Sequence, residues 1–359
     1  MKIAVLGLNH GYNFAQRIKG MAGVTLVAVA GNNAVAKNRA EKLDVPLFED
    51  YKQLIDACAL DGVIITLPNH LHKEAVIYCA DKGLHCLVEK PIADTTEAAR
   101  KMIDYCRYKQ VQLLVGHHRR FSSKINHLKQ LLDSGMLGDL VGVNMMWALA
   151  KDTDYFKEEW RIEKGGGPLL INGIHDLDNL LYVTDLHIES VYAAGRNKIR
   201  TLAVEDATAA ILEADDGTII QYFLTDGVPS PWSYEFNVHE NPVFHYNEQD
   251  CYFFFGTKGS LAFPSFRFYQ YSEGAYGWKH PLLERKIPHV EDTDPITAEL
   301  EHFVNVLKKT EQPRVTGEAG LITLELLEAI KLSVREKRSV SLQELFCGDA
   351  CEDMGFKRN

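Results

Sequence analysis

Three consecutive residues, Glu89, Lys90 and Pro91, have types that could do chemistry at the end of a strand. The apolar run 85–88 before them predicts a buried strand. In an open parallel sheet, ligands bind outside the carboxyl ends of the strands, so Lys90 and Glu89 are expected at the mouth of a site. A lysine there can bind an oxygen, donate a proton or, when desolvated, accept one. Alone, the three residues fit a solvated loop in which Lys90 pairs with Glu89 equally well.

A second candidate site is the loop that follows the first predicted strand. Dinucleotide-binding domains usually carry glycines here, because glycine lets the backbone approach the pyrophosphate at the start of the next helix. Gly7 is in place, but the second and third glycine positions hold Asn9 and Tyr12, and Gly11 is displaced by one. Asparagine tolerates left-handed backbone, so Asn9 can still make the turn. Gly7, Asn9, His10, Gly11 and Tyr12 are therefore expected to bind a dinucleotide.

The end of the second predicted strand, 24–30, bears on the choice of dinucleotide. In NAD-binding domains an acidic residue at this point bonds the adenosine ribose. This chain carries Asn32 there instead, and without a carboxylate a 2′-phosphate would not be repelled. Lys37 or Arg39 could lie nearby. The cofactor is therefore predicted to be NAD or NADP, with Asn32 among the residues that bind it.

A doubly wound domain would bring these strand ends together, and the first 121 residues predict one. The expected strands are 3–6, 24–30, 46–48, 62–67, 85–89 and 111–116, and the helices between them include 13–20, 51–58, 70–82 and 95–108. Continuous apolar strands that alternate with helices indicate a parallel sheet covered on both faces. Residues 1–121 are therefore assigned to an α/β dinucleotide-binding domain.

The pattern changes after Phe121. A helix over 122–134 leads into segments in which apolar and polar residues alternate: 141–149, 188–194, 207–213, 218–225, 252–255 and 266–271. The expected helices are 172–183 within this region and 295–309 and 320–336 near its end. Residues 122–340 thus predict an α+β domain for substrate binding and oligomerisation, with a large, mostly antiparallel open sheet. Residues 341–359 form a C-terminal tail.

Composition excludes several classes of function. A formal net charge of -10 and the lack of a long basic block argue against a nucleic-acid partner. No apolar run reaches the roughly 18 residues that a membrane-spanning helix needs. The seven cysteines are scattered and odd in number, which indicates reduced thiols in a cytoplasmic protein. Cys347 and Cys351 lack further ligands nearby, so no metal site is predicted.

An ordered series of motifs strengthens the case for a site. The motifs are Thr66-Leu67-Pro68-Asn69-His70-Leu71-His72, Glu89-Lys90-Pro91, Gly116-His117-His118-Arg119-Arg120-Phe121, Trp160-Arg161 and Gly165-Gly166-Gly167 followed by His175-Asp176-Leu177-Asp178. Together they closely resemble the glucose–fructose oxidoreductase / inositol dehydrogenase (Gfo/Idh/MocA) family over about residues 1–340. The resemblance implies an N-terminal Rossmann domain and a C-terminal domain whose open sheet forms dimer or tetramer contacts. It also implies hydride transfer between a sugar or polyol carbon and a nicotinamide.

The resemblance further implies roles for single residues. Lys90 matches the lysine that contacts the reacting oxygen and relays its proton, and His175 matches the catalytic histidine. A histidine suits a base of near-neutral pKa, and a positive lysine stabilises a developing alkoxide. The residues that resemble cofactor-binding positions of the family are Thr66, Pro68, Asn69, His72, Glu89, Lys90 and Arg161. His117 and His118 are expected to be structural or to lie behind the site.

One position departs from the family pattern. An aspartate usually stands four residues before this histidine, and here the residue is Ile171. Ile171 cannot bond a hydroxyl, and its neighbour Asn172 can bind polar groups but cannot act as a base. The proton relay is then expected to rest on Lys90 and His175. Substrate contacts are expected from Lys90, Asn172, His175 and Trp232, whose ring could stack on a sugar face or simply face the interior of a strand.

Three functions are compatible with this sequence. The first is an NAD(P)-dependent oxidoreductase acting on a hydroxyl carbon of a sugar, polyol or related compound, assembled as a homodimer or homotetramer. The second is a hydrolase or lyase that keeps its nicotinamide bound and oxidises the substrate transiently to acidify an adjacent C–H. The third is a sensor that binds a dinucleotide without turnover. Absorbance at 340 nm separates the first from the second, because only a net oxidation accumulates reduced nicotinamide.

Overall fold

The computed structural model describes residues 1–163, 165–288 and 291–346, which group into two compact units. Unit 1 comprises Met1–Ser122 and Asp294–Leu324, and unit 2 comprises Ser123–Thr293 and the chain from Glu325 onward. The predicted tail lies mostly outside the described residues, as do Cys347 and Cys351. The first boundary falls one residue after the predicted one, whereas the segment 294–324, assigned above to the second domain, groups with unit 1.

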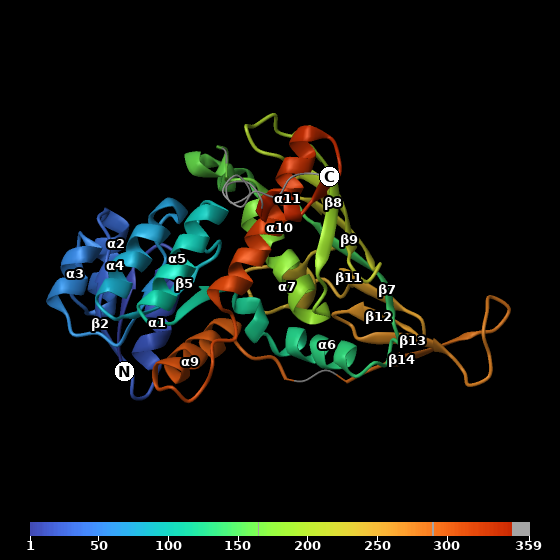
Figure 1. The fold of residues 1–359 in the computed structure, drawn as a ribbon, viewed down its shortest axis with the longest axis horizontal. Coiled ribbons are helices and arrows are strands. Elements are labelled where there is room, and N and C mark those ends of the chain that lie inside the picture. The colour runs from blue at the N-terminus through green and yellow to red at the C-terminus, as the bar shows by residue number, and fades with distance from the viewer. Residues whose placement is uncertain (164, 289–290, 347–359) are drawn as a thin grey trace, which may run out of the picture. The chain divides into compact units, whose positions relative to one another are not determined.

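Unit 1 is built on a six-stranded sheet with the order β3-β2-β1-β4-β5-β6 (Figure 1). Its strands are β1 (Lys2–Leu6), β2 (Thr25–Ala30), β3 (Leu47–Phe48), β4 (Gly62–Ile65), β5 (His85–Glu89) and β6 (Leu113–Gly116). The connecting elements are α1 (Gly11–Gly20), α2 (Ala34–Leu43), α3 (Tyr51–Ala57), η1 (Asn69–Leu71), α4 (His72–Asp81), α5 (Thr96–Tyr108) and η2 (His118–Phe121). Every strand pair is parallel, which confirms the predicted doubly wound fold. The strand order reverses between β1 and β4, the point where such sheets bind ligands.

Helix α9 (Pro295–Leu307) explains why the chain returns to unit 1. Its Phe303 and Leu307 are buried in one apolar cluster with strand residues such as Ile3 and Ile64. A Cβ at Gly62 would lie only 2.9 Å from Leu307 and 3.0 Å from Phe303, so the helix packs directly on β4. An amphipathic pattern reveals a buried helix face but does not reveal which sheet covers it.

Unit 2 contains a nine-stranded sheet with the order β14-β13-β12-β11-β7-β10-β9-β8-β15. Its strands are β7 (Leu140–Ala148), β8 (Ile188–Arg196), β9 (Ala207–Ala214), β10 (Ile219–Thr225), β11 (Tyr252–Gly256), β12 (Ser260–Phe263), β13 (Arg267–Tyr271), β14 (Leu282–Lys286) and β15 (Val340–Ser341). Only β7 and β10 pair in parallel, so the predicted mostly antiparallel sheet is confirmed. The strands β12, β14 and β15 were not predicted: β12 and β15 are short, and β14 is exposed along its whole length.

Helices cover one face of this sheet (Figure 1). The helices and short helical turns of unit 2 are α6 (Ser123–Asp133), α7 (Ile174–Thr184), α8 (Tyr234–Val238), α10 (Gly317–Glu336, which begins in unit 1), α11 (Gln343–Phe346), the 3₁₀ turns η3 (Thr153–Lys157) and η4 (Glu159–Arg161) and the π-helical turn η5 (Leu169–Gly173). Leu177 and Leu180 of α7 pack against Trp147 and Tyr222 in the core of unit 2. No helix of the described residues is both long and apolar enough to cross a membrane.

A buried carboxyl group fixes helix α7 on the sheet. Asp176 is fully buried, and its two oxygens accept hydrogen bonds from Tyr222 at 2.9 Å and from Tyr252 at 2.6 Å. The tyrosines come from β10 and β11, so one carboxyl joins the first turn of α7 to two strands. Because buried hydrogen bonds to carboxyl groups are costly to break, the orientation of this turn is well determined.

This anchor predicts a stability difference between two tyrosines. We expect Tyr252→Phe to lower the free energy of unfolding by about 1.5–3 kcal/mol, because it removes a donor to a buried carboxyl. The matched control is Tyr105→Phe, whose hydroxyl donates to Asp81 at 2.7 Å on the surface, and which should cost under about 1 kcal/mol. Urea denaturation of both variants measures the difference, and equal losses would contradict the anchor.

Candidate functional site

The turn after β1 is shaped by two glycines that lie against Thr66. Gly7 has a positive φ of +92°, and a Cβ there would stand 2.6 Å from the carbonyl oxygen of Thr66. A Cβ at Gly11 would stand 2.4 Å from Thr66 Oγ1 and 2.7 Å from Val5. The Thr66 hydroxyl donates toward the carbonyls of Gly7 at 2.7 Å and Leu6 at 3.0 Å. A side chain at Gly7 would meet the backbone of Thr66, and a side chain at Gly11 would meet the side chains of Thr66 and Val5, so neither fits unless its neighbours shift.

The glycine displaced by one position therefore fulfils the packing role that the sequence left open. Helix α1 starts at Gly11, directly after the turn, and its first turn contains no acidic residue. The backbone N–H groups of a helix N-terminus and the helix dipole attract anions. This tight, carboxylate-free turn at the switch point of the sheet fits the pyrophosphate of a dinucleotide.

The residues beside this turn bear on the adenosine end of the cofactor. Arg39 of α2 donates to the carbonyl of Asn9 at 2.7 Å, and its guanidinium lies 5.0 Å from the centre of the Tyr12 ring. A hollow next to them is lined by Tyr12, Ala34, Val35, Asn38, Arg39 and Lys42. Asn32 is exposed at the end of β2. The lining of this hollow carries two cationic side chains and no carboxylate, which suits the 2′-phosphate of NADP as well as NAD.

An ion pair connects the phosphate turn to the end of β5. His10 Nε2 lies 3.2 Å from Glu89 Oε1, and Glu89 raises the pKa of His10 although burial opposes this. Burial would raise the pKa of Glu89, but His10, together with Lys90 and His118, lowers it to about 2. Glu89 is therefore a carboxylate at neutral pH, beside the half-buried Lys90. Glu89 is therefore not a solvated loop residue, and the role of Lys90 stays a prediction.

His72 joins the loop after β4 to the loop after β5. It is fully buried, with Nε2 2.8 Å from the carbonyl of Leu67 and Nδ1 3.1 Å from the carbonyl of Pro91. Burial lowers the pKa of the His72 imidazole. Pro68 is exposed and Asn69 half-buried on the same loop. His72 can thus influence a cofactor by fixing the loops, and its direct contact with the cofactor stays a prediction.

The two histidines after β6 lie close behind Glu89. Burial and the neighbouring Arg119 lower the pKa of His118 to about 3, so its imidazole is neutral. His117 is buried. A Cβ at Gly116 would lie 3.3 Å from the Glu89 side chain, so this glycine leaves room for the carboxylate. The placement of His118 agrees with the expected role behind the site.

In unit 2, His175 lies in the first turn of α7, next to the carboxyl anchor of Asp176. The turn before it, η5, is π-helical, a distortion often found at functional sites. Ile171 and Asn172 belong to this turn. Among the described residues, the buried Asn172 Oδ1 meets no hydrogen-bond donor. An unpaired buried acceptor beside His175 suits a ligand that donates from a hydroxyl group.

Arg161 and Trp232 also lie in unit 2. The Arg161 guanidinium stacks 4.1 Å from the centre of the Tyr155 ring, and Nη1 donates to the carbonyl of Tyr155 at 3.0 Å. Trp232 is 42% exposed, so its ring is not part of a strand interior and can offer a face to a sugar. The predicted site residues are thus divided: the dinucleotide residues and Lys90 lie in unit 1, whereas Arg161, Asn172, His175 and Trp232 lie in unit 2.

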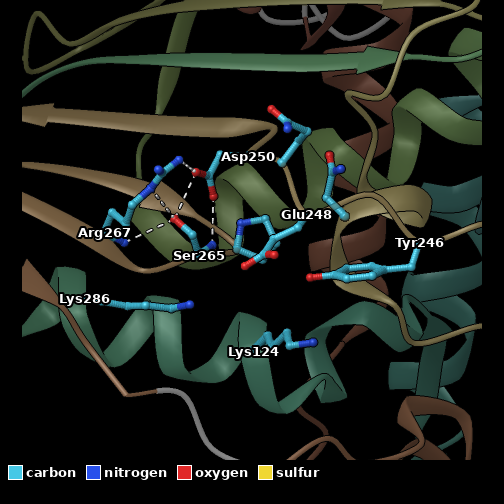
Figure 2. A pocket seen from close by; sticks show the side chains of 10 residues that line it. Lys124, Tyr246, Glu248, Asp250, Ser265, Arg267 and Lys286 are labelled. Atoms are coloured by element: carbon cyan, nitrogen blue, oxygen red, sulfur yellow. Dashed lines mark hydrogen bonds and ion pairs between the residues drawn. The ribbon is translucent and has the colours of Figure 1, made fainter.

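A separate hollow in unit 2 holds none of the predicted site residues (Figure 2). Its lining includes Lys124, Asp250, Ser265, Arg267 and Lys286, which come from α6 and from the segments around β11 to β14. Arg267 and Ser265 both bond Asp250, at 2.7 and 2.9 Å, and Lys124 donates to the carbonyl of Val238. Asp250, Ser265 and Arg267 are thus hydrogen-bonded to one another rather than left open to a ligand. Among the described residues, no group of three or more His, Cys, Asp or Glu side chains could hold a metal ion.

Sequence reasoning missed the His10–Glu89 pair and a buried lysine, Lys151, that follows β7. The pair joins residues 79 positions apart, and only the strand order β1-β4-β5 makes them neighbours. Lys151 had one signal in the sequence, its position immediately after a predicted strand.

Comparison with known proteins also divides the chain into an N-terminal and a C-terminal part. The family described as "Oxidoreductase family, NAD-binding Rossmann fold" matches residues 1–117. The family described as "GFO/IDH/MocA C-terminal domain" matches residues 125–262. The two matches together span well over half of the chain. They confirm the prediction that the N-terminal part binds a nicotinamide dinucleotide.

Similar proteins include several that act on sugars and polyols. Myo-inositol 2-dehydrogenase of Thermotoga maritima is 27% identical over 96% of this chain and 99% of the relative. D-glucoside 3-dehydrogenase of Escherichia coli is 26% identical over 88% of this chain and 90% of the relative. A 2,7-anhydro-N-acetylneuraminate hydratase of Mediterraneibacter gnavus is 28% identical over 54% of this chain and 52% of the relative. An oxidoreductase of Agrobacterium radiobacter, solved with NAD+, L-tartaric acid and magnesium, shares the fold with a TM-score of 0.81 at 17% identity, over 96% of this chain and 99% of the other.

The packing of Gly11 predicts a selective loss of dinucleotide binding. We expect Gly11→Ala to weaken NAD and NADP binding at least about tenfold, because the added methyl group must displace Thr66 or the start of α1. Gly20→Ala is the matched control, since a Cβ at the other end of the same helix meets nothing within 4 Å. Calorimetric titration of both variants measures the affinities. Unchanged binding by Gly11→Ala would contradict this account of the turn.

Proposed function

The chain belongs to the GFO/IDH/MocA oxidoreductase family, and from this premise we propose that it oxidises a hydroxyl carbon of a sugar, polyol or related compound. It is an NAD(P)-dependent oxidoreductase. The observation that carries the proposal is the tight Gly7–Gly11–Thr66 turn linked through His10 to Glu89 and Lys90. A dinucleotide site and a lysine that can polarise an oxygen thus share one edge of the sheet.

The residues of this chain divide the work of alcohol oxidation. A bound nicotinamide supplies the hydride acceptor, and the protein must bind the hydroxyl and remove its proton. Lys90 would stabilise the negative charge that develops on the oxygen, and His175 would accept the proton. Asn172 Oδ1, the buried acceptor, would bind a neighbouring hydroxyl. Glu89 keeps its negative charge over a wide pH range and would attract the positive charge of the neighbouring Lys90.

A second candidate function is favoured by two observations. One relative is a hydratase, and Ile171 replaces the carboxylate that would assist His175. In this alternative the substrate is oxidised only transiently, which acidifies the adjacent C–H, and the dinucleotide returns to its starting state. Product would then form without a net change in absorbance at 340 nm.

We expect Lys90→Ala and His175→Ala each to lower kcat/KM by about 10²–10⁴-fold, the usual effect of removing an acid–base group. The matched controls are the exposed Lys101→Ala on α5 and His187→Ala before β8, which should stay within about twofold of the wild type. The assay is the absorbance change at 340 nm with NAD and NADP over a panel of sugars and inositols. Product without absorbance change would favour the hydratase-like alternative, and no turnover of any substrate would contradict both.

We further propose that the protein is a homodimer or homotetramer that associates through the open face of the unit 2 sheet. Several large apolar side chains on this face are between 37% and 55% exposed: Tyr192, Ile211, Ile219, Phe223 and Phe255. Exposed apolar patches of this kind mark interaction surfaces. Light scattering of the wild type should give two or four copies, and Ile211→Asp with Phe223→Asp should give a monomer. A monomeric wild type would contradict the proposal.

A cytoplasmic location is the last part of the proposal. The cysteines within the described residues, Cys58, Cys79, Cys86, Cys106 and Cys251, are free thiols. Most of them are buried, which suits a reducing compartment. Fractionation of the producing cells tests this placement.

A further inference from the structure

Lys151 is a buried lysine in unit 2 that the proposed reaction does not use. It lies just after β7, where its backbone N–H donates to the carbonyl of Asp226 at 3.0 Å. Its side chain is only 10% exposed, and its ammonium lies 4.3 Å from the centre of the Tyr155 ring. Asp226 Oδ2 is 3.4 Å away, but no acceptor among the described residues makes a hydrogen bond to Nζ.

Arg161 presents a second donor of the same kind. Its guanidinium also lies against the Tyr155 ring, and its buried Nε has no hydrogen-bond acceptor within the described parts of the chain. Two cationic groups thus contact one aromatic ring, each with hydrogen-bonding capacity left over. Buried donors without acceptors are costly, and cationic ones more so. A site that binds a ligand would recover this energy.

The acidic groups around Lys151 all have other partners, although Asp226 also forms an ion pair with Lys151 itself. Asp226 is paired with Arg200, Glu235 accepts from Trp147 Nε1 at 2.5 Å, and Glu205 accepts from the backbone N–H of Leu169 at 3.0 Å. Burial lowers the pKa of Lys151 to about 7; Glu235 and Glu205 oppose this, and Arg200 and Arg161 reinforce it. An additional negative charge would therefore be stabilised at this place.

One of these acids, Glu205, connects the surroundings of Lys151 to the segment that carries the predicted catalytic histidine. Glu205 accepts a hydrogen bond from the backbone N–H of Leu169, the first residue of η5, which continues directly into α7. A Cβ at Gly167 would lie 2.4 Å from Glu205 Oε1, so the glycine run is packed on this carboxylate. His175 follows Leu169 by six residues and lies in the first turn of α7.

We propose that Lys151 and Arg161 form a subsite for an anionic oxygen group, a carboxylate or a phosphate, on the sugar or polyol substrate. The inference rests on the proposed function and names its substrate class: acidic sugars or sugar phosphates in preference to neutral ones. A neutral hydroxyl would satisfy one donor, whereas a carboxylate or phosphate can accept from both. The four-carbon stem of Lys151 lets its ammonium turn toward the ligand without a change of backbone.

The test compares substrates that differ only in charge. Wild type and Lys151→Met are assayed with glucose, glucuronate and glucose 6-phosphate, and with the corresponding inositol and inositol phosphate. We expect Lys151→Met to lower kcat/KM for the preferred anionic substrate by about 10–150-fold, the value of a lost charged hydrogen bond. Neutral substrates and the KM for the dinucleotide should change less than about twofold. The uronate and phosphate arms decide which anion is bound.

Lys157→Met is the matched control, since this exposed lysine of η3 lies in the same loop and pairs only with the exposed Asp154 among the described residues. It should behave as the wild type with every substrate. Equal losses on neutral and anionic substrates in Lys151→Met, or a loss confined to the dinucleotide, would overturn the subsite while leaving the proposed function intact.

If no substrate is oxidised, a binding experiment still tests the anion subsite separately from the proposed oxidoreductase function. Calorimetry of glucuronate and glucose 6-phosphate with the full-length protein should show binding to the wild type that weakens at least tenfold in Lys151→Met. The affinity should also fall as the pH rises from 6 to 8.5, because Lys151 loses the proton that attracts the anion. Anion binding that is the same in Lys151→Met, or that keeps its pH dependence there, would overturn the subsite.

Discussion

The contact of Thr66 with Gly7 and Gly11 is the constraint on which the rest of unit 1 depends. It joins the carboxyl ends of β1 and β4, the two strands at which the sheet reverses its order. Thr66 approaches Gly7 with its backbone and Gly11 with its side chain, so a larger residue at either position would require a shift. The helix that starts at Gly11 presents its N-terminus to the same edge. The proposed binding of a pyrophosphate at this edge would thus be a consequence of how two strands pack.

Further contacts extend this constraint outward to the groups that do chemistry. His10 carries it to Glu89 through an ion pair, and His72 joins the loops after β4 and β5 through their carbonyls. Lys90 is therefore held between fixed neighbours. In unit 2, Asp176 performs the equivalent task, because its two tyrosine bonds fix the turn that carries His175. Each unit thus orients the side chain proposed to react, Lys90 in unit 1 and His175 in unit 2, by buried polar contacts.

The sequence predicted the sheets well, because apolar periodicity reports directly which residues are buried. It also predicted that Glu89 stands at the end of a strand, and β5 does end there. Such a prediction is possible because the carboxyl ends of parallel strands meet at one edge of the sheet. It could not place α9 on β4, because an amphipathic helix shows that it has a partner but not which one. It could not tell what the displaced Gly11 does, because the close contact of this glycine with the Thr66 side chain is a tertiary contact. Lys151 was overlooked because burial of a lysine arises from tertiary contacts with Tyr155 and Trp147.

The central claim is that the substrate carbon gives its hydride to the dinucleotide held at the Gly7–Gly11 turn. The most direct test uses a sugar or polyol deuterated at the oxidised carbon and follows the dinucleotide by mass spectrometry. The account predicts that one deuterium appears in reduced NAD or NADP for each molecule oxidised. Product formed while the dinucleotide remains oxidised and unlabelled would contradict it.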